Sequence, residues 1–287
     1  MLKQPLQTLL ASAFAATLGS ASAAPLKVEV FNPGEAAIFP VASVLVSGAQ
    51  DAVLIDAQFS RAEALKLVEQ IRASGKRLTT VYVSHGDPDF YFGLDVIHAA
   101  FPAAKIVATA YTVAAIEKKK DAKVAYWGPI LKDNAPHSII VPQVLQGDRI
   151  ELEGETLQIT GLQPERSYVW IPSIRTVAGG VVVFNDLHVW TADTQTAASR
   201  QQWLATLDGI AALQPNTVVP GHFKVGSALT PASIGFTRDY LVKFEAETAA
   251  AANSAALITR MQQLYPQAGL KAALDTSAKV AKGEMKW

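Results

Sequence analysis

The stretch from Thr79 to Gly93, TTVYVSHGDPDFYFG, decides the fold of this chain of 287 residues. It begins with an apolar run rich in β-branched residues, which is typical of a buried strand. A glycine and a proline then end the strand. His85, Asp87 and Asp89 follow within five residues, so the strand delivers ionisable side chains to one place. The pattern predicts a functional site at the end of this strand.

Composition limits the class of protein. Half of the residues are hydrophobic, and 25 basic groups balance 25 acidic ones. Such a chain can bury one large core, and its balanced charge argues against a nucleic-acid partner. The sequence has no cysteine, which excludes disulfides, thiolate metal ligands and a cysteine nucleophile.

The first residues have the pattern of a secretory signal peptide. Lys3 precedes an uncharged segment from Leu6 to Gly19, and Ala21-Ser22-Ala23 forms a small-residue cleavage site. The apolar segment is shorter than the roughly 20 residues that a membrane-spanning helix needs. We therefore predict a signal peptide at residues 1–23, a periplasmic or secreted mature protein, and no stable membrane anchor after processing.

The remaining sequence alternates strand and helix patterns. Strands are expected at residues 26–31, 41–47, 51–56, 76–84 and 104–109, with helices at 60–75, 94–100 and 111–120. We interpret the lysine-rich end of the last of these helices as a solvated terminus. Short strands recur over 139–180, at 181–184 and at 217–219, a helix is expected at 197–213, and the segment from residue 230 is helical. The order predicts a layered α/β protein.

The Thr79–Gly93 stretch resembles the metallo-β-lactamase fold superfamily, whose signature is a strand followed by H-x-H-x-D-H and a helix. His85 stands at the first His of that motif, Asp87 at the second, Asp89 at the Asp, and Phe90 at the last His. The resemblance covers most of the mature chain. It implies an αββα sandwich, of mixed α/β (α+β) class, formed by a single domain over residues 24–287.

A second element, Val219-Pro220-Gly221-His222, resembles the late His ligand of the same family. Two other ligand positions differ. The segment 161–166 stands where the family has G-x-x-H, with Gln163 or Glu165 as the nearest substitute. The segment 177–180, ending in Gly180, stands where the family has its bridging Asp, and glycine offers no side-chain ligand.

The resemblance therefore implies at most a reduced metal site. His85, Asp87, Asp89 and His222 are the candidate ligands of one divalent ion, and the two carboxylates favour Mn²⁺ or Fe²⁺ beside Zn²⁺. Asp89 and His222 are also the candidate catalytic residues. In the alternative interpretation the pocket holds no metal: His85 and Asp89 only hydrogen-bond the loop backbone, and Phe90 packs in the core.

Substrate contacts are sought among aromatic and polar side chains near the motif. Tyr91 is one candidate, because aromatic residues beside polar groups suit small-molecule pockets. Trp190 and His188, which follow a strand, are the others. The alternative for all three is a structural role in the core.

Three hypotheses for function follow. The first is metal-dependent hydrolysis of an ester, lactone, amide or phosphoester. The second is a non-catalytic, periplasmic protein that binds a small molecule in the pocket of a lost metal site. The third is metal-free catalysis with Asp89 and His222 as an acid–base pair.

Overall fold

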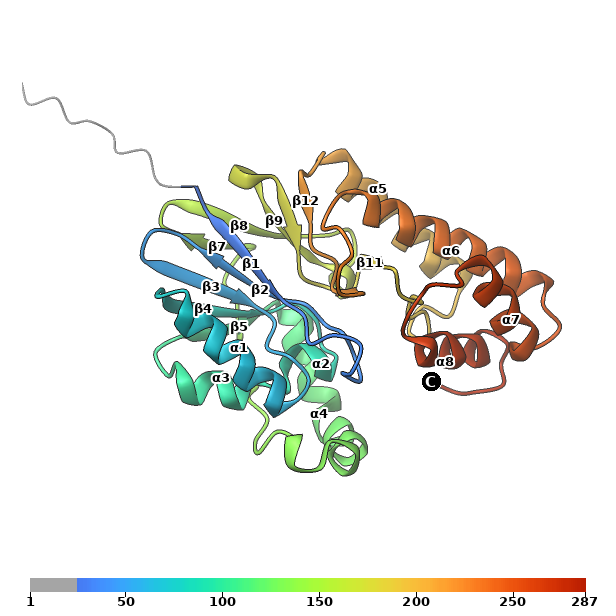
Figure 1. Cartoon of the computed structure of the whole chain (residues 1–287), viewed down its shortest axis with the longest axis horizontal. Coiled ribbons are helices and arrows are strands. Elements are labelled where there is room, and N and C mark those ends of the chain that lie inside the picture. The colour runs from blue at the N-terminus through green and yellow to red at the C-terminus, as the bar shows by residue number, and fades with distance from the viewer. Residues whose placement is uncertain (1–24) are drawn as a thin grey trace, which may run out of the picture.

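A computed structural model describes residues 25–287, and the predicted signal peptide lies outside this range. Within it, no helix is both long and apolar enough to cross a membrane. The described residues form two β-sheets packed face to face, with helices on both outer sides (Figure 1).

The first sheet has six strands in the order β1-β2-β3-β4-β5-β6. The strands are β1 (Lys27–Phe31), β2 (Ser43–Ser47), β3 (Asp51–Ile55), β4 (Arg77–Val83), β5 (Lys105–Ala108) and β6 (Gln143–Val144). β1 to β3 form an antiparallel meander, whereas β3 to β6 run parallel. The parallel order brings the loops that follow β3 and β4 to the same edge of the sheet.

The second sheet has five strands in the order β12-β10-β9-β8-β7, and two further strands pair beside it. The strands are β7 (Arg149–Leu152), β8 (Glu155–Thr160), β9 (Tyr168–Ile171), β10 (Thr176–Ala178) and β12 (Thr217–Val218), with the pair β11 (Phe184–Asn185) and β13 (His222–Phe223). β11 and β13 are parallel, with Phe184 opposite His222.

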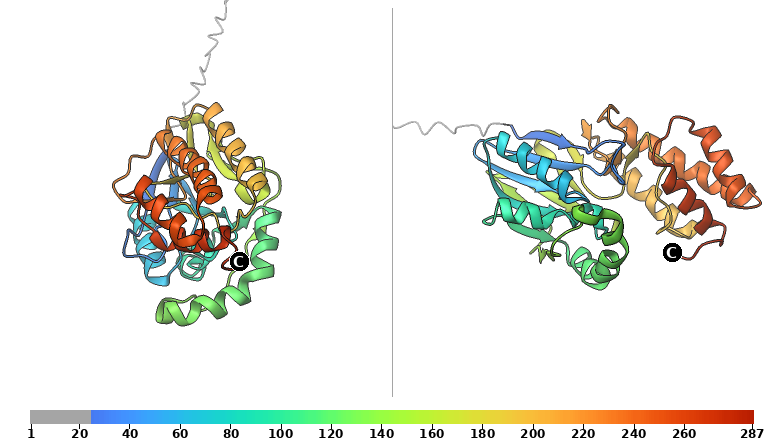
Figure 2. Two further views of the ribbon diagram at one scale, coloured as in Figure 1. Left: turned by 90° about the vertical axis from the view of Figure 1, so that its right-hand side faces the viewer. Right: turned by 60° about the horizontal axis from the view of Figure 1, so that its bottom comes forward.

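Helices cover the outer sides of the sheets (Figure 2). Those of the first half are α1 (Arg61–Ala73), α2 (Pro88–Tyr91), α3 (Leu94–Ala100) and α4 (Ala110–Leu131), followed by the 3₁₀ turn η1 (Lys132–Asn134). Those of the second half are η2 (Pro164–Arg166), η3 (Pro172–Ile174), α5 (Ala197–Ala212), α6 (Ala232–Ala250), α7 (Ser254–Leu264) and α8 (Lys271–Ala281). Of these, α6–α8 extend beyond the second sheet at one end of the molecule (Figure 2).

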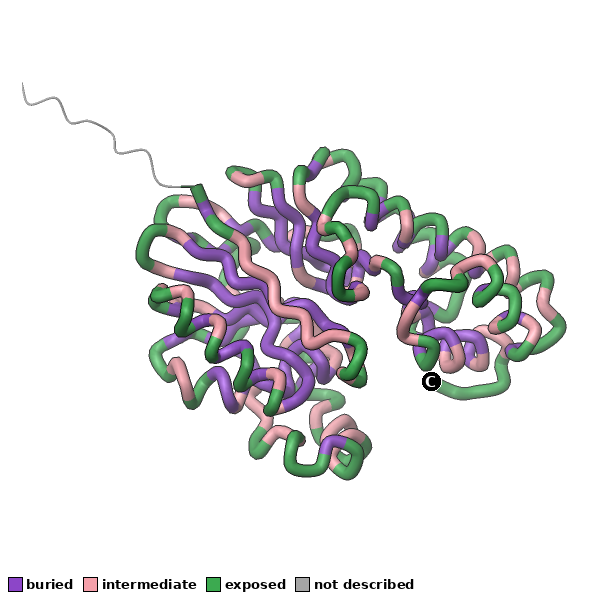
Figure 3. The backbone as a smooth tube through the Cα atoms, viewed as in Figure 1, coloured by how far each residue is buried: buried purple, intermediate pink, exposed green. Residues whose placement is uncertain are grey.

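Three apolar clusters correspond to the three interfaces between these layers. One lies between the sheets and joins Val44 and Ile55 to Val169 and Ile171. The second lies under α1 and α3, and the third joins the second sheet to α5–α8. Figure 3 shows the buried strands inside and the exposed helix faces outside. This arrangement confirms the predicted αββα sandwich.

Local sequence signals explain the elements that were predicted well and those that were not. The capping box of α1 forms as expected, with Ser60 accepting from the amide of Glu63. Helix α4 instead continues to Leu131, with Pro129 inside its last turn, so the predicted end near residue 120 was wrong. The strand expected at 181–184 is also wrong, since only Phe184 and Asn185 pair.

Two glycines allow neighbouring segments of the second half to approach closely. A Cβ atom on Gly221 would lie 2.0 Å from the carbonyl oxygen of Gly180. Gly180 itself has φ +75°, and its own Cβ would lie 2.2 Å from the Ser167 carbonyl oxygen. Neither position has room for a side chain, so an aspartate at residue 180 is sterically excluded.

We therefore expect Gly221→Ala to destabilise the fold by about 3 kcal/mol or more, because backbone must shift to admit the methyl group. Gly209→Ala is the matched control. No atom lies within 4 Å of a Cβ at this position of α5, and alanine favours helix by about 1 kcal/mol. Urea unfolding of both variants measures the difference. Equal stability would contradict the close packing at Gly221.

Candidate active site

The loop that carries His85 is fixed by a buried carboxylate. Asp56, at the end of β3, accepts hydrogen bonds from the Ser84 amide at 2.8 Å and the Ser84 hydroxyl at 2.6 Å. The Ser84 hydroxyl accepts in turn from the amide of Gly180 at 2.7 Å. Burial raises the pKa of Asp56 to about 8, despite the opposing effect of both Ser84 bonds. The loop after β4 is thus tied to both halves of the sandwich.

Asp89 and His222 come together from the two halves. Asp89 lies on the short helix α2, and His222 begins β13. His222 Nε2 lies 2.8 Å from Asp89 Oδ2, and each side chain is only 7% exposed. Two backbone bonds hold the His222 segment in place, from the Ala42 amide to the Gly221 carbonyl and from the Gly221 amide to the Val183 carbonyl. The pair is therefore a fixed part of the fold.

Two phenylalanines surround the His222 imidazole. The Phe184 ring stacks on it at 5.1 Å between centroids, with an interplanar angle of 10°. The Phe90 ring meets it edge-on at 5.5 Å and meets His85 in the same manner at 5.4 Å. Phe90 is fully buried. His85 and His222 are thus both packed against one apolar ring.

His85 and Asp87 form a second pair. His85 Nδ1 accepts a hydrogen bond from the Asp87 amide at 3.2 Å and lies 3.5 Å from Asp87 Oδ2. The other oxygen of Asp87 lies 3.5 Å from Lys123 Nζ. The Asp87 carboxylate is therefore neutralised by an ammonium group of α4.

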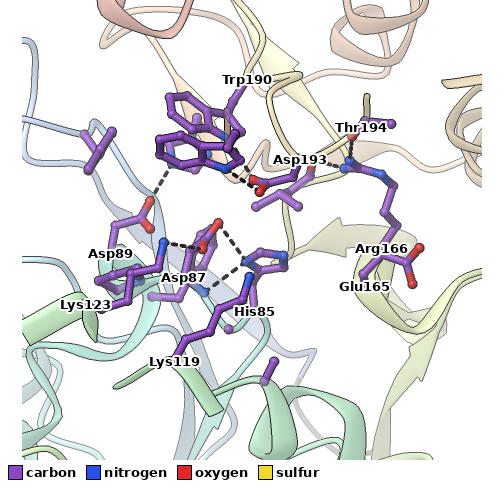
Figure 4. Close-up of a pocket in the computed structure, with 18 of the residues that line it drawn as sticks. His85, Asp87, Asp89, Lys119, Lys123, Glu165, Arg166, Trp190, Asp193 and Thr194 are labelled. Atoms are coloured by element: carbon purple, nitrogen blue, oxygen red, sulfur yellow. Dashed lines mark hydrogen bonds and ion pairs between the residues drawn. The ribbon is translucent and has the colours of Figure 1, made fainter. Parts of the chain in front are cut away.

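All four predicted metal-binding residues line one cleft of about 320 Å³ (Figure 4). Its wall combines aromatic and charged side chains from both halves. The aromatic ones are Phe39, Phe90, Tyr111, Trp127, Phe184, Trp190 and Trp287. The charged ones are Asp87, Asp89, Lys119, Lys123, Glu165, Arg166 and Asp193. A concave apolar surface with convergent polar groups is typical of a small-molecule site.

A sequence profile described as the metallo-beta-lactamase superfamily matches residues 37–222, which is more than half of the chain. The chain belongs to the metallo-beta-lactamase superfamily. No curated protein matches the sequence. The matched range ends at His222, so it contains the whole Asp89–His222 arrangement.

Solved structures agree on the superfamily fold. A metallo-beta-lactamase family protein from Thermus thermophilus is 16% identical, with a TM-score of 0.62 over 90% of this chain and 91% of that one. The DIM-1 metallo-beta-lactamase is 18% identical, with a TM-score of 0.55 over 77% and 99%. A metallo-beta-lactamase from Pontibacter korlensis is 15% identical, with a TM-score of 0.53 over 78% and 97%. Identities this low show the fold alone.

Superfamily membership implies divalent metal ions, but the side chains present do not fit one. Among residues 25–287, no three His, Asp or Glu side chains are grouped so as to hold an ion. The four candidates form two separate pairs, with Phe90 packed against a histidine of each. Asp89 is hydrogen-bonded to His222, and Asp87 is paired with Lys123. The positive charge of Lys123 also repels a metal cation. The single-ion site that the sequence suggested is not formed by this arrangement.

The neighbour of His222 also differs from what the family resemblance implied. The resemblance put Gly180 at the place of the bridging Asp, whereas β11 places Phe184 beside His222. A phenyl ring therefore stands next to His222, where the resemblance implied a ligand. Gln163 is bonded to Thr206 and to the Gln202 carbonyl on α5, and Glu165 is exposed, so neither replaces the missing ligand.

Sequence reasoning missed the contribution of α4. Tyr111, Ala115, Lys119, Lys123 and Trp127 all line the cleft, and they recur every fourth residue. This spacing places them along one side of a helix. The spacing is visible in the sequence, but the predicted helix end near residue 120 left Lys123 and Trp127 outside the helix.

Trp190 lines the cleft as predicted, together with an unforeseen partner. The indole N–H groups of Trp190 and Trp287 donate to the two carboxylate oxygens of Asp193, each at 2.7 Å. The two rings lie 4.9 Å apart at 70°. One carboxylate thus holds two tryptophans in a fixed orientation.

Tyr91 and His188 do not line the cleft, in contrast to their predicted role as substrate contacts. Tyr91 is 1% exposed and packs in the first half against Phe92. His188 is equally buried in the second half, with Nδ1 3.1 Å from the Tyr240 hydroxyl. Both are therefore structural side chains of the core, which was the alternative interpretation.

His188 makes the stability of the protein dependent on pH. Burial, assisted by Lys271, lowers the pKa of His188 to about 4 from 6.5. The unfolded chain therefore takes up the proton first, and stability is lost as the pH falls from about 6.5 towards 4, by about 3 kcal/mol at most. We expect His188→Gln to flatten this part of the pH profile of unfolding free energy. The exposed His98→Gln is the control, and an unchanged slope in His188→Gln would refute the assignment.

Proposed function

We propose that this chain binds a small molecule in the cleft between its two halves without a resident metal ion. The observation that carries the proposal is the state of the Asp89–His222 pair. His222 Nε2 and Asp89 Oδ2 lie 2.8 Å apart, and Phe90 and Phe184 pack against the imidazole. A metal ion needs several lone pairs directed at one point, whereas Nε2 and Oδ2 are directed at each other and His222 Nδ1 is buried without a hydrogen-bond partner among residues 25–287.

The cleft itself supports the binding part of the proposal. Its volume of about 320 Å³ is at the lower end of the range for small-ligand sites. Five of its aromatic side chains are not fully buried and offer apolar surface to a ligand: Phe39, Tyr111, Trp127, Trp190 and Trp287. The proposed site of action is the periplasm or the medium, after removal of residues 1–23.

A second candidate function is hydrolysis by acid–base chemistry, and one feature of Asp89 favours it. Asp89 Oδ2 is bound by His222, whereas Oδ1 accepts no hydrogen bond from residues 25–287 and is not sealed from solvent. The imidazole orients the carboxylate, so Oδ1 can accept a proton from a water held in the cleft. That water would attack an activated ester or lactone. His222 then serves as a positioning residue for Asp89.

Two measurements on the purified mature protein test these functions. We expect elemental analysis after dialysis to find well below one equivalent of zinc, manganese or iron. We also expect EDTA to leave unchanged both ligand binding, followed by calorimetry, and any hydrolysis of a panel of esters and lactones. One tightly bound equivalent with chelator-sensitive turnover would contradict the proposal.

Asp89→Asn separates the two candidates, because asparagine keeps the shape of the side chain but loses the base. Loss of a chelator-insensitive hydrolysis with unchanged melting temperature would establish acid–base catalysis. If the protein shows no measurable turnover and Asp89→Asn binds the ligand unchanged, only the binding function is supported. Glu151→Gln, an exposed carboxylate on β7 outside the cleft, is the control for the charge change.

A further inference from the structure

Arg166 is an unusual charge in the wall of the cleft. It is only 7% exposed, yet among residues 25–287 no carboxylate oxygen lies within 4 Å of its guanidinium. The other arginine buried to this degree, Arg200, pairs with Glu245. Burying an arginine without an anionic partner costs free energy, so such a charge is retained for a reason.

The contacts of Arg166 leave donors free. Its Nη1 donates to the Val181 carbonyl at 3.3 Å, its Nη2 donates to the Thr194 hydroxyl, and its face lies 3.5 Å above the Trp203 ring. A guanidinium has five N–H groups, so these bonds hold it in place without using all of them. Burial lowers the pKa of Arg166 to about 10, so it stays charged at neutral pH.

Lys119 is a second cation in the cleft without a partner. It lies on the cleft side of α4, and its ammonium makes no ion pair or hydrogen bond within the described part of the chain. Its neighbours on the helix differ, since Lys120 pairs with Glu117 and Lys123 with Asp87. Figure 4 shows the side chains of Lys119 and Lys123 directed from α4 towards His85 and Asp87.

Three of the four acidic side chains of the cleft already have a hydrogen-bond or ion-pair partner. Asp87 is bound by Lys123, Asp89 by His222, and both oxygens of Asp193 by indole N–H groups. Glu165 is exposed at the surface. The two cleft cations without a carboxylate partner among residues 25–287 are Lys119 and Arg166, and they lie in segments that pack together, α4 and η2.

The tryptophan pair supplies a different kind of surface beside these cations. Asp193 fixes the rings of Trp190 and Trp287, and Lys123 Nζ lies 5.8 Å from the centroid of the Trp287 ring. Rings whose N–H groups are already satisfied offer their faces and edges to a ligand. Aromatic surfaces of this kind favour a planar, apolar partner.

We propose that the ligand of this cleft is an aromatic anion, whose planar body packs against Trp190 and Trp287 and whose carboxylate or related oxyanion is bound by Arg166 and Lys119. The anionic group supplies the partner that the buried guanidinium lacks. This inference rests on the proposed binding function and specifies its ligand class.

Calorimetric titration with three probes tests the ligand class: 2-naphthoate, its neutral isostere 2-naphthamide, and acetate. We expect naphthoate to bind at least about tenfold more tightly than naphthamide, because charge-assisted hydrogen bonds to arginine are the stronger ones. Acetate should bind more weakly than naphthoate by a similar factor, because it has no ring. Added salt should weaken naphthoate binding and leave naphthamide binding unchanged.

Matched variants locate the two halves of the site. Lys119→Gln should reduce the preference for naphthoate over naphthamide about two- to fivefold, whereas Lys118→Gln, an exposed neighbour outside the cleft, should not. Arg166→Gln should remove most of the preference, with the melting temperature measured alongside. Trp190→Leu should weaken both naphthyl probes about threefold or more, and Leu65→Ala, exposed on α1 and outside the cleft lining, should weaken neither.

The outcomes separate this inference from the proposed function. Equal binding of naphthoate and naphthamide, lost in Trp190→Leu, would overturn the anionic ligand class and leave the binding function standing. Equal effects of Lys119→Gln and Lys118→Gln would overturn the assigned location, even if Arg166→Gln fails to fold. Binding of none of the probes at millimolar concentration would count against both the ligand class and the binding cleft.

Discussion

The hydrogen bond between Asp89 and His222 is the interaction on which the rest of the site depends. It joins helix α2 of the first half to strand β13 of the second, and both groups are buried. Such a bond forms only if the two backbones approach closely, and the segment of His222 is held against the first half by the bond from the Ala42 amide to the Gly221 carbonyl. A buried carboxylate left without this partner would carry a large desolvation cost. The packing of the two halves and the geometry of the pair are therefore coupled.

The same packing explains why the site resembles its superfamily in shape and differs in chemistry. Phe90 and Phe184 occupy space around His222 where polar groups would be needed to hold an ion. The phenyl rings leave the imidazole with Asp89 as its hydrogen-bond partner. The cleft cations that have no carboxylate partner among residues 25–287 lie on α4 and η2. The proposed recognition of an anion therefore uses residues outside the family motif.

The alternating order of strands and helices was predictable from local sequence signals, and the αββα arrangement followed from the family resemblance. The apolar run before His85 and the capping box at Ser60 specify a strand and a helix without tertiary help. The end of α4 was not predictable in this way. Pro129 has no N–H to bond the preceding turn and its ring crowds that turn, so its sequence position indicates a helix end, whereas α4 continues through it to Leu131. The position of β11 was also missed, because the strand that it pairs with, and not its own two residues, determines where so short a strand forms.

The site was only partly predictable because motif matching finds residues but not their partners. His85, Asp87, Asp89 and His222 do line one cleft, yet the sequence does not reveal that they contact one another in two separate pairs. Arg166 was passed over because nothing in its neighbourhood along the chain shows that it is buried. Its environment is made by Val181, Thr194 and Trp203, which are distant in sequence. A charge becomes informative only when its burial and its missing partner are both known, and both are tertiary properties.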